Sequence, residues 1–458
     1  MKYNKLTDIA IFVLVAAAVF QTGKLWLGNT DSHNFFYSLY SSQSGQIRET
    51  DSDYDVIEPE KTVVGYGNRK FNMLYSDGGE ASVTALSEKV VGDVLRNGSY
   101  ESTSGISWAD YIEGKAVIME YAFYMSPREY IRGYGVNNDD FLNNVRSINY
   151  IVVVPGSGSS ETTYCYFIDS GMDEAHLFTL TGAESSPELY NTIQNMQYSG
   201  DGRIDYISTV QSGLNIFDSI YVPQWTDGEY VYNAVYAEDP FDDGNGGIDG
   251  EKLGDCVNNF FDNYVSGGTY VNNVYTFTNE NVVVKFYENG VLEYYDYGTG
   301  TETSEQTLAE AYTISQDFLK NDRYIRNDIY LSGAETRNDG LALYYDYAVD
   351  DIPIRISEQA ASDMGMTHAI EVVVSNGGVK RYKRYTAEFK KDENTTAAIN
   401  VDMISAWDDA IMSYSGSEPV TSVEDMSIGY YLENEESDLF IKWFTSVNGA
   451  EIVGETYK

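Results

Sequence analysis

The hydrophobic positions form one continuous run near the N-terminus and periodic patterns in the rest of the chain. The run IAIFVLVAAAVFQTGKLWL extends from Ile9 to Leu27. As an α-helix it would be about 28 Å long, which is close to the hydrocarbon thickness of a bilayer. Lys24 near its end can reach the interface, and Trp26 suits an interfacial anchor. The run therefore predicts one transmembrane helix within residues 1–28.

The charges that flank this run predict its orientation. Lys2 and Lys5 precede it, and after Lys24 no Lys or Arg occurs until Arg48. The positive-inside rule then places the N-terminus in the cytoplasm and the bulk of the chain outside the cell membrane. No second apolar run of spanning length follows, so the pattern predicts a single-pass protein.

A cleaved signal peptide is the alternative interpretation of the same run. The residues Ala16, Ala17 and Ala18 would allow cleavage after Ala18. The apolar character continues through Val19 and Phe20, which favours a retained anchor. The polar residues 29–54 would then form a stalk.

Helical and strand-like patterns alternate along the first part of the remaining chain. The segment ASVTALSEKVVGDVLRNG has apolar residues at helical spacing and a stop signal at Asn97-Gly98. The segment SSPELYNTIQNMQYSG begins with Ser and Pro at positions typical of a helix start. Between them, GKAVIMEYAFYM, INYIVVVPG and TYCYFIDS are typical of strands.

A second unit follows with the same order of helix and strands. The segment GEKLGDCVNNFFDNYVSGG predicts a helix that ends at Gly267-Gly268. The apolar face of this helix is expected at Leu253, Val257, Phe260, Phe261 and Tyr264. The segment YTFTNENVVVKFYENGVLEYYDYG then predicts strands, with a hairpin turn at Asn289-Gly290.

A third unit repeats the order with more elements. The helix over SEQTLAEAYTISQDFLKND is expected to begin with a capping box of Thr303 and Gln306. Strands follow in GLALYYDYAVDDIPIRIS and in HAIEVVVSNGGVKRYKRYTAEF, whose Asn376-Gly377 predicts a turn. A helix over NVDMISAWDDAIMSY and a strand pair over VEDMSIGYYLENEESDLFIKWFTSV complete the chain. The apolar face of that last helix is expected at Val401, Ile404, Trp407, Ile411 and Tyr414.

The repeated combination of helices and antiparallel strands predicts an α+β fold. Hydrophobic residues make up 43% of the chain, which is enough to build packed cores. The expected order is a cytoplasmic N-terminus and transmembrane helix at 1–28, a stalk at 29–54, and α+β domains at 55–212, 213–302 and 303–458.

The charge of the chain narrows the choice of partners. Asp and Glu number 71 against 29 Lys and Arg, and the formal net charge is -42. Because such a surface repels phosphate backbones, we expect no nucleic-acid binding. Cys165 and Cys256 are too few for a zinc site or a disulfide framework. They are either one disulfide of an exported protein or two separate buried thiols.

Residue patterns for catalysis are weak. The three histidines, His33, His176 and His368, form no metal cluster or Cys/His pair in the sequence. His368 opens a predicted strand, so we expect a structural role for it. The loop PGSGSSE lacks the spacing of a nucleophile elbow. With 71 acidic residues, a carboxylate pair of the glycosidase type would arise by chance and is not specific.

The strongest candidate for a metal site is the loop DDGNGGIDGE from Asp242 to Glu251. Counted from Asp243, it resembles a calcium loop with acidic or amide residues at alternating positions. Gly247, Ile248 and Gly254 occupy the fifth, sixth and twelfth positions, where an EF-hand needs other residues. The alternative is a flexible acidic loop, and we expect no catalytic residue, no metal and no cofactor.

The third unit resembles the YycH family, and its pattern is also similar to the relative YycI. The resemblance rests on LAEAYTISQDFL, YLSG, LALYYDYAVDDIPIRIS, HAIEVVVSNGGVKRYKR and VEDMSIGYYL with Trp443. The segment EPEKTVVGYGNRKFNMLYSD and the N-terminal anchor fit the same family. These motifs are specific for a fold and carry no chemistry.

The resemblance implies a membrane-anchored, extracytoplasmic regulator of Gram-positive bacteria without enzymatic activity. Such proteins bind the sensor histidine kinase WalK, also called YycG, together with YycI, in a two-component system that controls cell-wall metabolism. Contacts through the membrane helix are implied, and the small residues in this helix suit close helix packing. The expected contact residues are Ile9, Phe12, Val13, Ala16, Ala17, Val19, Phe20 and Trp26.

Two alternatives stay open at this stage. In the first, the helix serves as a plain anchor whose alanines face lipid. In the second, the outer part is an anchored or secreted binding module for cell-wall glycan or another extracellular ligand, which would bind without any contribution from the helix.

Overall fold

The computed structural model describes residues 54–457 except 68, 76–81, 112, 159, 200–203, 215–220, 226–228, 266, 299–305, 417–418 and 435–437. The predicted transmembrane helix and stalk lie outside this part. None of the helices in the described part combines the length and the apolar content needed to span a bilayer. The described residues belong to one compact unit, and the division into three domains stays a prediction.

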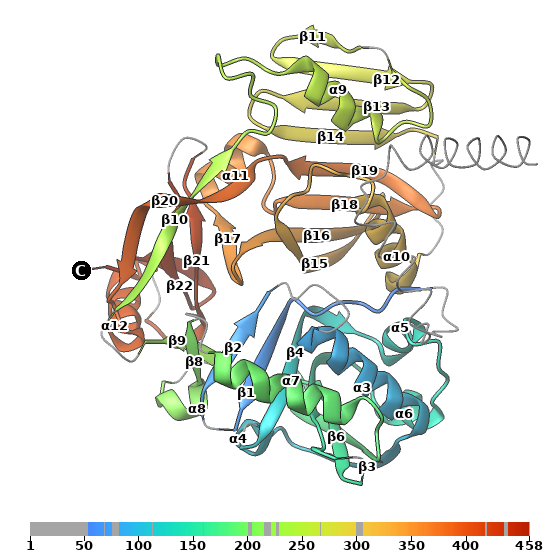
Figure 1. Cartoon of the computed structure of the whole chain (residues 1–458), viewed down its shortest axis with the longest axis vertical. Helices are drawn as coiled ribbons and strands as arrows, with labels where there is room; N and C mark the ends of the chain where they lie inside the picture. Colours follow the sequence, from blue (N-terminus) through green and yellow to red (C-terminus); the bar gives the residue numbers. More distant parts are fainter. Residues whose placement is uncertain are drawn as a thin grey trace, which may run out of the picture. The chain divides into compact units, whose positions relative to one another are not determined.

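The first half of the described chain forms a nine-stranded antiparallel sheet, in the order β3-β7-β6-β5-β4-β1-β2-β8-β9 (Figure 1). Helices α3 and α7 pack side by side on this sheet. The strands are β1 (Lys61–Tyr66), β2 (Phe71–Leu74), β3 (Ser99–Ser104), β4 (Lys115–Met125), β5 (Ile148–Val154), β6 (Thr162–Asp169), β7 (Glu174–Thr181), β8 (Asp205–Ser208) and β9 (Tyr221–Gln224). The helices are α3 (Val83–Asn97), α4 (Trp108–Tyr111), α5 (Pro127–Arg132), α6 (Asp139–Asn144), α7 (Ser186–Ser199) and α8 (Thr209–Ser212).

Helix α3 shows why these segments fold as predicted. The Ser82 hydroxyl accepts a hydrogen bond from the backbone N–H of Ala85 and caps the first turn. Leu86, Val90 and Val94 recur at helical spacing and are fully buried. The helix ends at Asn97, and the Gly98 N–H bonds the Val94 carbonyl. The predicted helix and its stop signal are therefore confirmed.

The second half forms a 12-stranded sheet, in the order β11-β12-β13-β14-β19-β18-β16-β17-β21-β22-β23, with β15 paired to β16. All these pairs are antiparallel except β17 with β21. The strands are β11 (Thr269–Val271), β12 (Val274–Asn279), β13 (Val282–Tyr287), β14 (Val291–Asp296), β15 (Asp328–Arg337), β16 (Gly340–Val349), β17 (Ile352–Ile356), β18 (Ile370–Ser375), β19 (Gly378–Tyr385), β21 (Val423–Leu432), β22 (Ile441–Val447) and β23 (Ala450–Gly454). The helices are α9 (Gly250–Asn258), α10 (Leu308–Leu319), α11 (Glu358–Met364) and α12 (Met403–Ser413). With antiparallel sheets and helices in both halves, the predicted α+β class is confirmed.

Helices α9 and α10 cover the same face of the second sheet. Phe260, just after α9, and Phe318 in α10 stack at 5.6 Å, and both contact the rings of Tyr294 in β14 and Tyr382 in β19. Tyr294 and Tyr382 are direct cross-strand partners. Because side chains alternate between the two faces of a strand, the residues that neighbour these tyrosines along β14 and β19 point to the opposite face.

Three sequence-based expectations about helices were wrong in detail. Helix α9 ends at Asn258, well before Gly267, and Tyr264 is 80% exposed. The Asn258 side chain explains the early end, because its amide group bonds both the N–H and the carbonyl of Val265 and turns the chain back. In α12, Ile404 is exposed, and Ala406 and Ala410 supply the buried face.

The capping box of α10 also lies one turn later than expected. Thr307 is the N-cap, its hydroxyl accepts from the N–H of Glu310, and the Glu310 carboxylate accepts from the N–H of Thr307. Thr303 lies outside the described residues. The Thr-x-x-Glu spacing from Thr307 to Glu310 provides a carboxylate at the third helical position, which the pair Thr303 and Gln306 lacks.

Replacing Thr307 by alanine is expected to lower the free energy of unfolding by about 1 kcal/mol, because the first turn of α10 loses its cap. Thr303→Ala is the matched control, since α10 begins at Leu308. Urea denaturation of both variants would measure this. An equal loss in both, or a larger loss in Thr303→Ala, would contradict the assignment of the cap.

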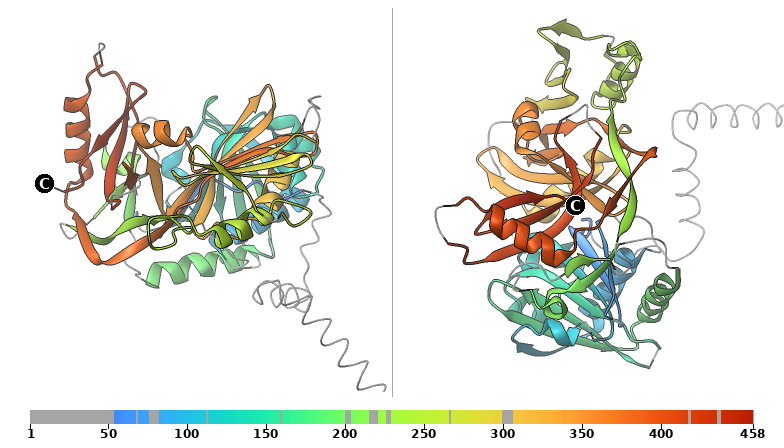
Figure 2. Two further views of the ribbon diagram at one scale, coloured as in Figure 1. Left: turned by 90° about the horizontal axis from the view of Figure 1, so that it is seen from above. Right: turned by 90° about the vertical axis from the view of Figure 1, so that its left-hand side faces the viewer.

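One long-range pairing was not predicted. Strands β10 (Tyr230–Glu238) and β20 (Glu388–Ile399) form a separate two-stranded antiparallel ribbon and run side by side (Figure 1 and Figure 2). The register shifts between Asn233 and Val235, where Asn233 donates to the Asp392 carbonyl. The ribbon joins segments from the two halves of the described chain.

The first sheet contains a buried histidine. His176 in β7 has a 3% exposed side chain, and its Nδ1 lies 3.0 Å from the Thr103 hydroxyl. Burial lowers the pKa of His176 below its usual value of 6.5, although Glu174 at 3.7 Å opposes the shift. The imidazole is therefore neutral in the folded protein at neutral pH.

We expect stability to fall as the pH drops below the unfolded-state pKa of about 6.5, because the unfolded chain then binds a proton that the fold does not. The melting temperature of the protein should fall more between about pH 7.5 and pH 5.5 than that of His176→Gln. Equal pH dependence in both proteins would show that His176 contributes nothing.

Candidate interaction surface

The second sheet carries a row of charged side chains on the face opposite α9 and α10. Glu293 in β14 pairs with Lys383 in β19, Lys383 pairs with Glu371 in β18, and Glu371 pairs with Tyr344 in β16. Cross-strand partners point to the same face of a sheet. The four residues therefore form one row across four strands.

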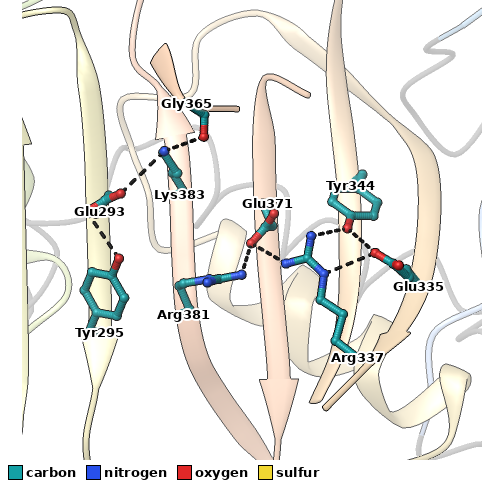
Figure 3. A network of polar contacts seen from close by, with 9 residues as sticks. All are labelled: Glu293, Tyr295, Glu335, Arg337, Tyr344, Gly365, Glu371, Arg381 and Lys383. Carbon is teal, nitrogen blue, oxygen red and sulfur yellow. Dashed lines mark hydrogen bonds and ion pairs between the residues drawn. The ribbon is translucent and has the colours of Figure 1, made fainter. Parts of the chain in front are cut away.

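A second row and an outer strand extend this surface. Tyr295 in β14 is the partner of Arg381 in β19, and Glu335 and Arg337 project from β15. Figure 3 shows that these side chains point toward one another across the strands. We call this surface the charged sheet face; it consists of Glu293, Tyr295, Glu335, Arg337, Tyr344, Glu371, Arg381 and Lys383.

Arg337 is the centre of one half of the charged sheet face. Its Nη1 donates to Glu371 at 3.0 Å, its Nε donates to Glu335 at 3.1 Å, and its Nη2 donates to the Tyr344 hydroxyl at 2.6 Å. The Tyr344 hydroxyl in turn donates to Glu335 at 2.9 Å. Arg381 donates to the same carboxylate oxygen of Glu371. The Arg337 guanidinium is thus held by three bonds, and the Arg381 guanidinium by its bond to Glu371 (Figure 3).

Lys383 is the centre of the other half. Its Nζ donates to the carbonyl of Gly365 at 2.8 Å and lies 3.5 Å from Glu293. Two tyrosine hydroxyls donate to the same Glu293 oxygen, Tyr287 at 2.8 Å and Tyr295 at 3.3 Å. The Lys285 ammonium lies 5.8 Å from the Tyr295 ring, which extends the surface onto β13.

Burial strengthens the polar contacts of this face. The side chains of Glu371, Lys383 and Glu293 are 17%, 16% and 13% exposed. Burial, followed by the hydrogen bond to Glu335, raises the pKa of Tyr344 to about 12. The bonds from Tyr344 and Arg337 hold the pKa of Glu335 below its usual range. Tyr344 therefore stays a donor, and Glu335 an acceptor, across the physiological pH range.

The charged sheet face differs in charge from the chain as a whole. Arg337, Arg381 and Lys383 balance Glu293, Glu335 and Glu371, three basic against three acidic side chains, whereas the whole chain has 29 basic and 71 acidic residues. Juxtaposed like charges cost free energy when two surfaces meet. A charge-balanced face with tyrosine rings is therefore a favourable place for another acidic protein to dock.

The candidate residues singled out in the sequence are not among those of the charged sheet face. The eight expected contact residues of the membrane helix, Ile9, Phe12, Val13, Ala16, Ala17, Val19, Phe20 and Trp26, lie outside the described residues. Trp443 is buried in β22, its indole N–H donates to the Val401 carbonyl at 3.1 Å, and its ring lies 5.5 Å from that of Trp225. It supports the fold and faces away from solvent.

The acidic loop uses its carboxylates to hold its own backbone. Asp243 accepts from the N–H groups of Asn245 and Gly247, and Asp249 accepts from those of Glu251 and Lys252 at the start of α9. Asp249 is thus the N-cap of α9. Within the part of the chain that the structure describes, no group of three or more His, Cys, Asp or Glu side chains is arranged to hold a metal ion.

The two cysteines do not pair with each other, and His368 lies beside the second sheet. Cys165 and Cys256 are two free, buried thiols in different halves of the described chain, as one of the two interpretations expected. Burial raises the pKa of both thiols. His368 lies two residues before β18, with its Nδ1 2.8 Å from Asp346 and its ring stacked on Tyr344. It borders the charged sheet face.

Sequence reasoning did not identify the charged sheet face. The run KRYKRY places Arg381 and Lys383 two residues apart, and the run IEVVV places one charged residue, Glu371, among apolar ones. Each of these runs is typical of a strand. What the sequence lacks is the pairing of β14, β19, β18 and β16, which brings the charges together.

Comparisons with known proteins agree with this architecture. No family model matches the sequence, and no curated protein does. Among solved structures, YycH from Bacillus subtilis matches with a TM-score of 0.51 and 11% identity, over 87% of this chain and 95% of that chain. An uncharacterized protein from Eubacterium rectale ATCC 33656 matches with a TM-score of 0.34 and 13% identity, over 53% of this chain and 88% of that chain, which is too low to carry an argument. The resemblance to the YycH family is confirmed at the level of the fold: this chain has a YycH-like fold.

Proposed function

We propose that the protein is a non-enzymatic accessory regulator of a sensor histidine kinase of the WalK/YycG type, which controls cell-wall metabolism. The observation that carries this proposal is the similarity of the fold to YycH over 87% of this chain and 95% of that chain. The sequence motifs from Leu308 to Trp443 suggest the same family independently of the structure.

The proposed location follows from the N-terminal sequence. Residues Ile9 to Leu27 hold the chain in the cell membrane as a single-pass anchor, with the N-terminus in the cytoplasm and the bulk outside. Contacts with the kinase run through this helix, where small residues allow close packing. A YycI-like protein is the proposed second partner.

The charged sheet face is the proposed docking surface of the outer part. Its side chains are held in place by multiple hydrogen bonds, so little conformational entropy is lost when a partner covers them. Its balanced charge lets an acidic partner approach a chain whose net charge is -42.

Co-purification from native membranes in mild detergent tests the proposal. The intact chain is compared with a chain whose Ile9 to Leu27 is replaced by an unrelated spanning helix. Recovery of the kinase with the intact chain alone supports regulation through the membrane helix. Recovery with both chains places the contact in the outer part. Recovery with neither chain contradicts the proposal and favours a binding module for cell-wall glycan.

A further inference from the structure

The first described residues enter the fold between two helices from different halves of the chain. Tyr54 donates its hydroxyl to Glu310 in α10 at 3.2 Å, and the Asp55 N–H donates to the Thr313 hydroxyl at 2.8 Å. The Glu58 N–H donates to the hydroxyl of Tyr312, which is buried, at 3.4 Å. Residues 54–58 are therefore attached along the first turns of α10.

Helix α5 holds the same segment from the other side. The Arg132 guanidinium lies 5.7 Å from the ring of Tyr54. At the end of α5, a Cβ on Gly133 would lie 2.6 Å from the Cα of Val56, so only glycine permits this close approach. The segment thus passes tightly along the C-terminus of α5.

The two helices also contact each other directly. Arg132 donates to the hydroxyl of Thr307, the N-cap of α10, at 3.0 Å and lies 3.5 Å from Glu310. The Glu129 carboxylate accepts from the N–H of Ala309 at 3.1 Å. A carboxylate at the N-terminus of a helix satisfies a free N–H and suits the helix dipole.

Helix α10 connects this junction to the sheet that carries the charged sheet face. The Ser315 hydroxyl lies 2.5 Å from the Tyr345 hydroxyl of β16, and the Phe318 ring lies 5.2 Å from that of Tyr382 in β19. Both contacts are on the face of the sheet opposite the charged one. A shift of α10 therefore reaches the strands that position the charged side chains.

The polar contacts at the junction join part-buried groups, and Val56 and Ile57 beside them are buried. A junction held by a few side-chain contacts opens more readily than a sheet held by continuous backbone hydrogen bonds. Residues 54–58 follow directly on the N-terminal segment in the chain. A displacement of that segment would therefore act first on the contacts of residues 54–58 with α10.

We propose that residues 54–58, Arg132 and the first turns of α10 form a latch that couples the N-terminal segment to the second sheet. When the segment is withdrawn, α10 separates from α5 as one step, and both sheets stay folded. This inference rests on the proposed function for its role in signalling, in which the membrane helix acts on the outer docking surface through the latch.

Hydrogen exchange of the full-length chain in detergent tests the latch itself. The variant Arg132→Ala with Thr313→Val removes the contacts of two side chains and leaves Tyr312 and Glu129 unchanged. The informative amides are those of Glu58 and Ala309, because their own acceptors are intact. We expect both to exchange about tenfold faster in the variant, while amides of β5 and β6 keep their protection.

The matched control is Arg128→Ala with Thr278→Val, at exposed positions on α5 and on β12. The control should exchange like the unmodified protein. Unchanged exchange at Ala309 in the latch variant would overturn the proposal. So would uniformly faster exchange in both sheets, because the contacts would then merely support the fold.

A second measurement on the same variants separates the latch from the proposed function. The latch variant should recover as much kinase as the intact chain but should lose its effect on kinase autophosphorylation. An effect equal to that of the intact chain would overturn the role in signalling. If the intact chain recovers no kinase, the proposed function fails, and the exchange data still decide whether the latch exists.

Discussion

Replacing Asp322 by alanine is expected to lower the free energy of unfolding by about 3–5 kcal/mol, one of the largest effects of any single substitution in this chain. Asp322 follows α10 and lies 3.1 Å from the Arg384 Nε, with both side chains fully buried. Tyr382 also donates its hydroxyl to Asp322 at 2.8 Å. Removal of the carboxylate leaves the buried guanidinium without its charged partner, because an arginine side chain stays protonated in a protein.

Urea denaturation of Asp322→Ala would measure the loss. Asp317→Ala is the matched control: Asp317 forms an exposed ion pair with Lys320, and such pairs contribute about 0–1 kcal/mol. The double variant Asp322→Leu with Arg384→Met should regain much of the stability, because it removes both charges together. A loss in Asp322→Ala no larger than that in Asp317→Ala would contradict this account of the buried pair.

The second large effect is expected on partner binding. Arg337→Gln with Arg381→Gln should lower the amount of kinase recovered from membranes at least about tenfold, a loss near 1.4 kcal/mol of binding free energy. The two substitutions leave Glu335 and Glu371 without their guanidinium partners. The face then becomes acidic and repels an acidic partner as the rest of the chain does.

Lys252→Gln with Lys320→Gln changes the net charge by the same amount at exposed positions elsewhere. Its recovery of kinase should equal that of the unmodified protein. Equal recovery by both double variants would remove the charged sheet face from the interface. Equal losses in both double variants would indicate an effect of total charge, and would likewise remove the charged sheet face from the interface.

The local elements of the fold were predictable because their signals are short-range. The spacing of Leu86, Val90 and Val94 predicted α3, and its N-cap and stop lie within the same segment. The Asn376-Gly377 pair predicted a turn, because Asn and Gly tolerate positive φ best. In the structure both residues adopt positive φ, at 52° and 77°. Such features depend on neighbours in sequence and need no knowledge of the fold.

The arrangement of the strands was not predictable because it depends on distant pairing. Tyr230 in β10 pairs with Ile399 in β20, and Glu293 in β14 pairs with Lys383 in β19, across long intervening segments. The end of α9 was missed for a related reason, since the bonds from Asn258 to Val265 form only once the chain has turned back.

The charged sheet face shows the same limit at the level of function. Arg337, Glu371 and Lys383 occupy three different segments, and each segment by itself is typical of an ordinary half-exposed strand. Only the pairing of the strands places them on one surface, where Arg337 and Glu371 bond each other and Lys383 pairs with Glu293. Arg384, which follows Lys383, points to the other face and pairs with Asp322 in the core, a difference that charge alone does not reveal.

The most direct test of the central claim is the autophosphorylation rate of the purified kinase in a reconstituted bilayer, with and without the intact chain. The account predicts that the rate changes several-fold when the intact chain is present and stays at its basal value with Arg337→Gln/Arg381→Gln. An unchanged rate with the intact chain would contradict the claim that this protein regulates a sensor kinase.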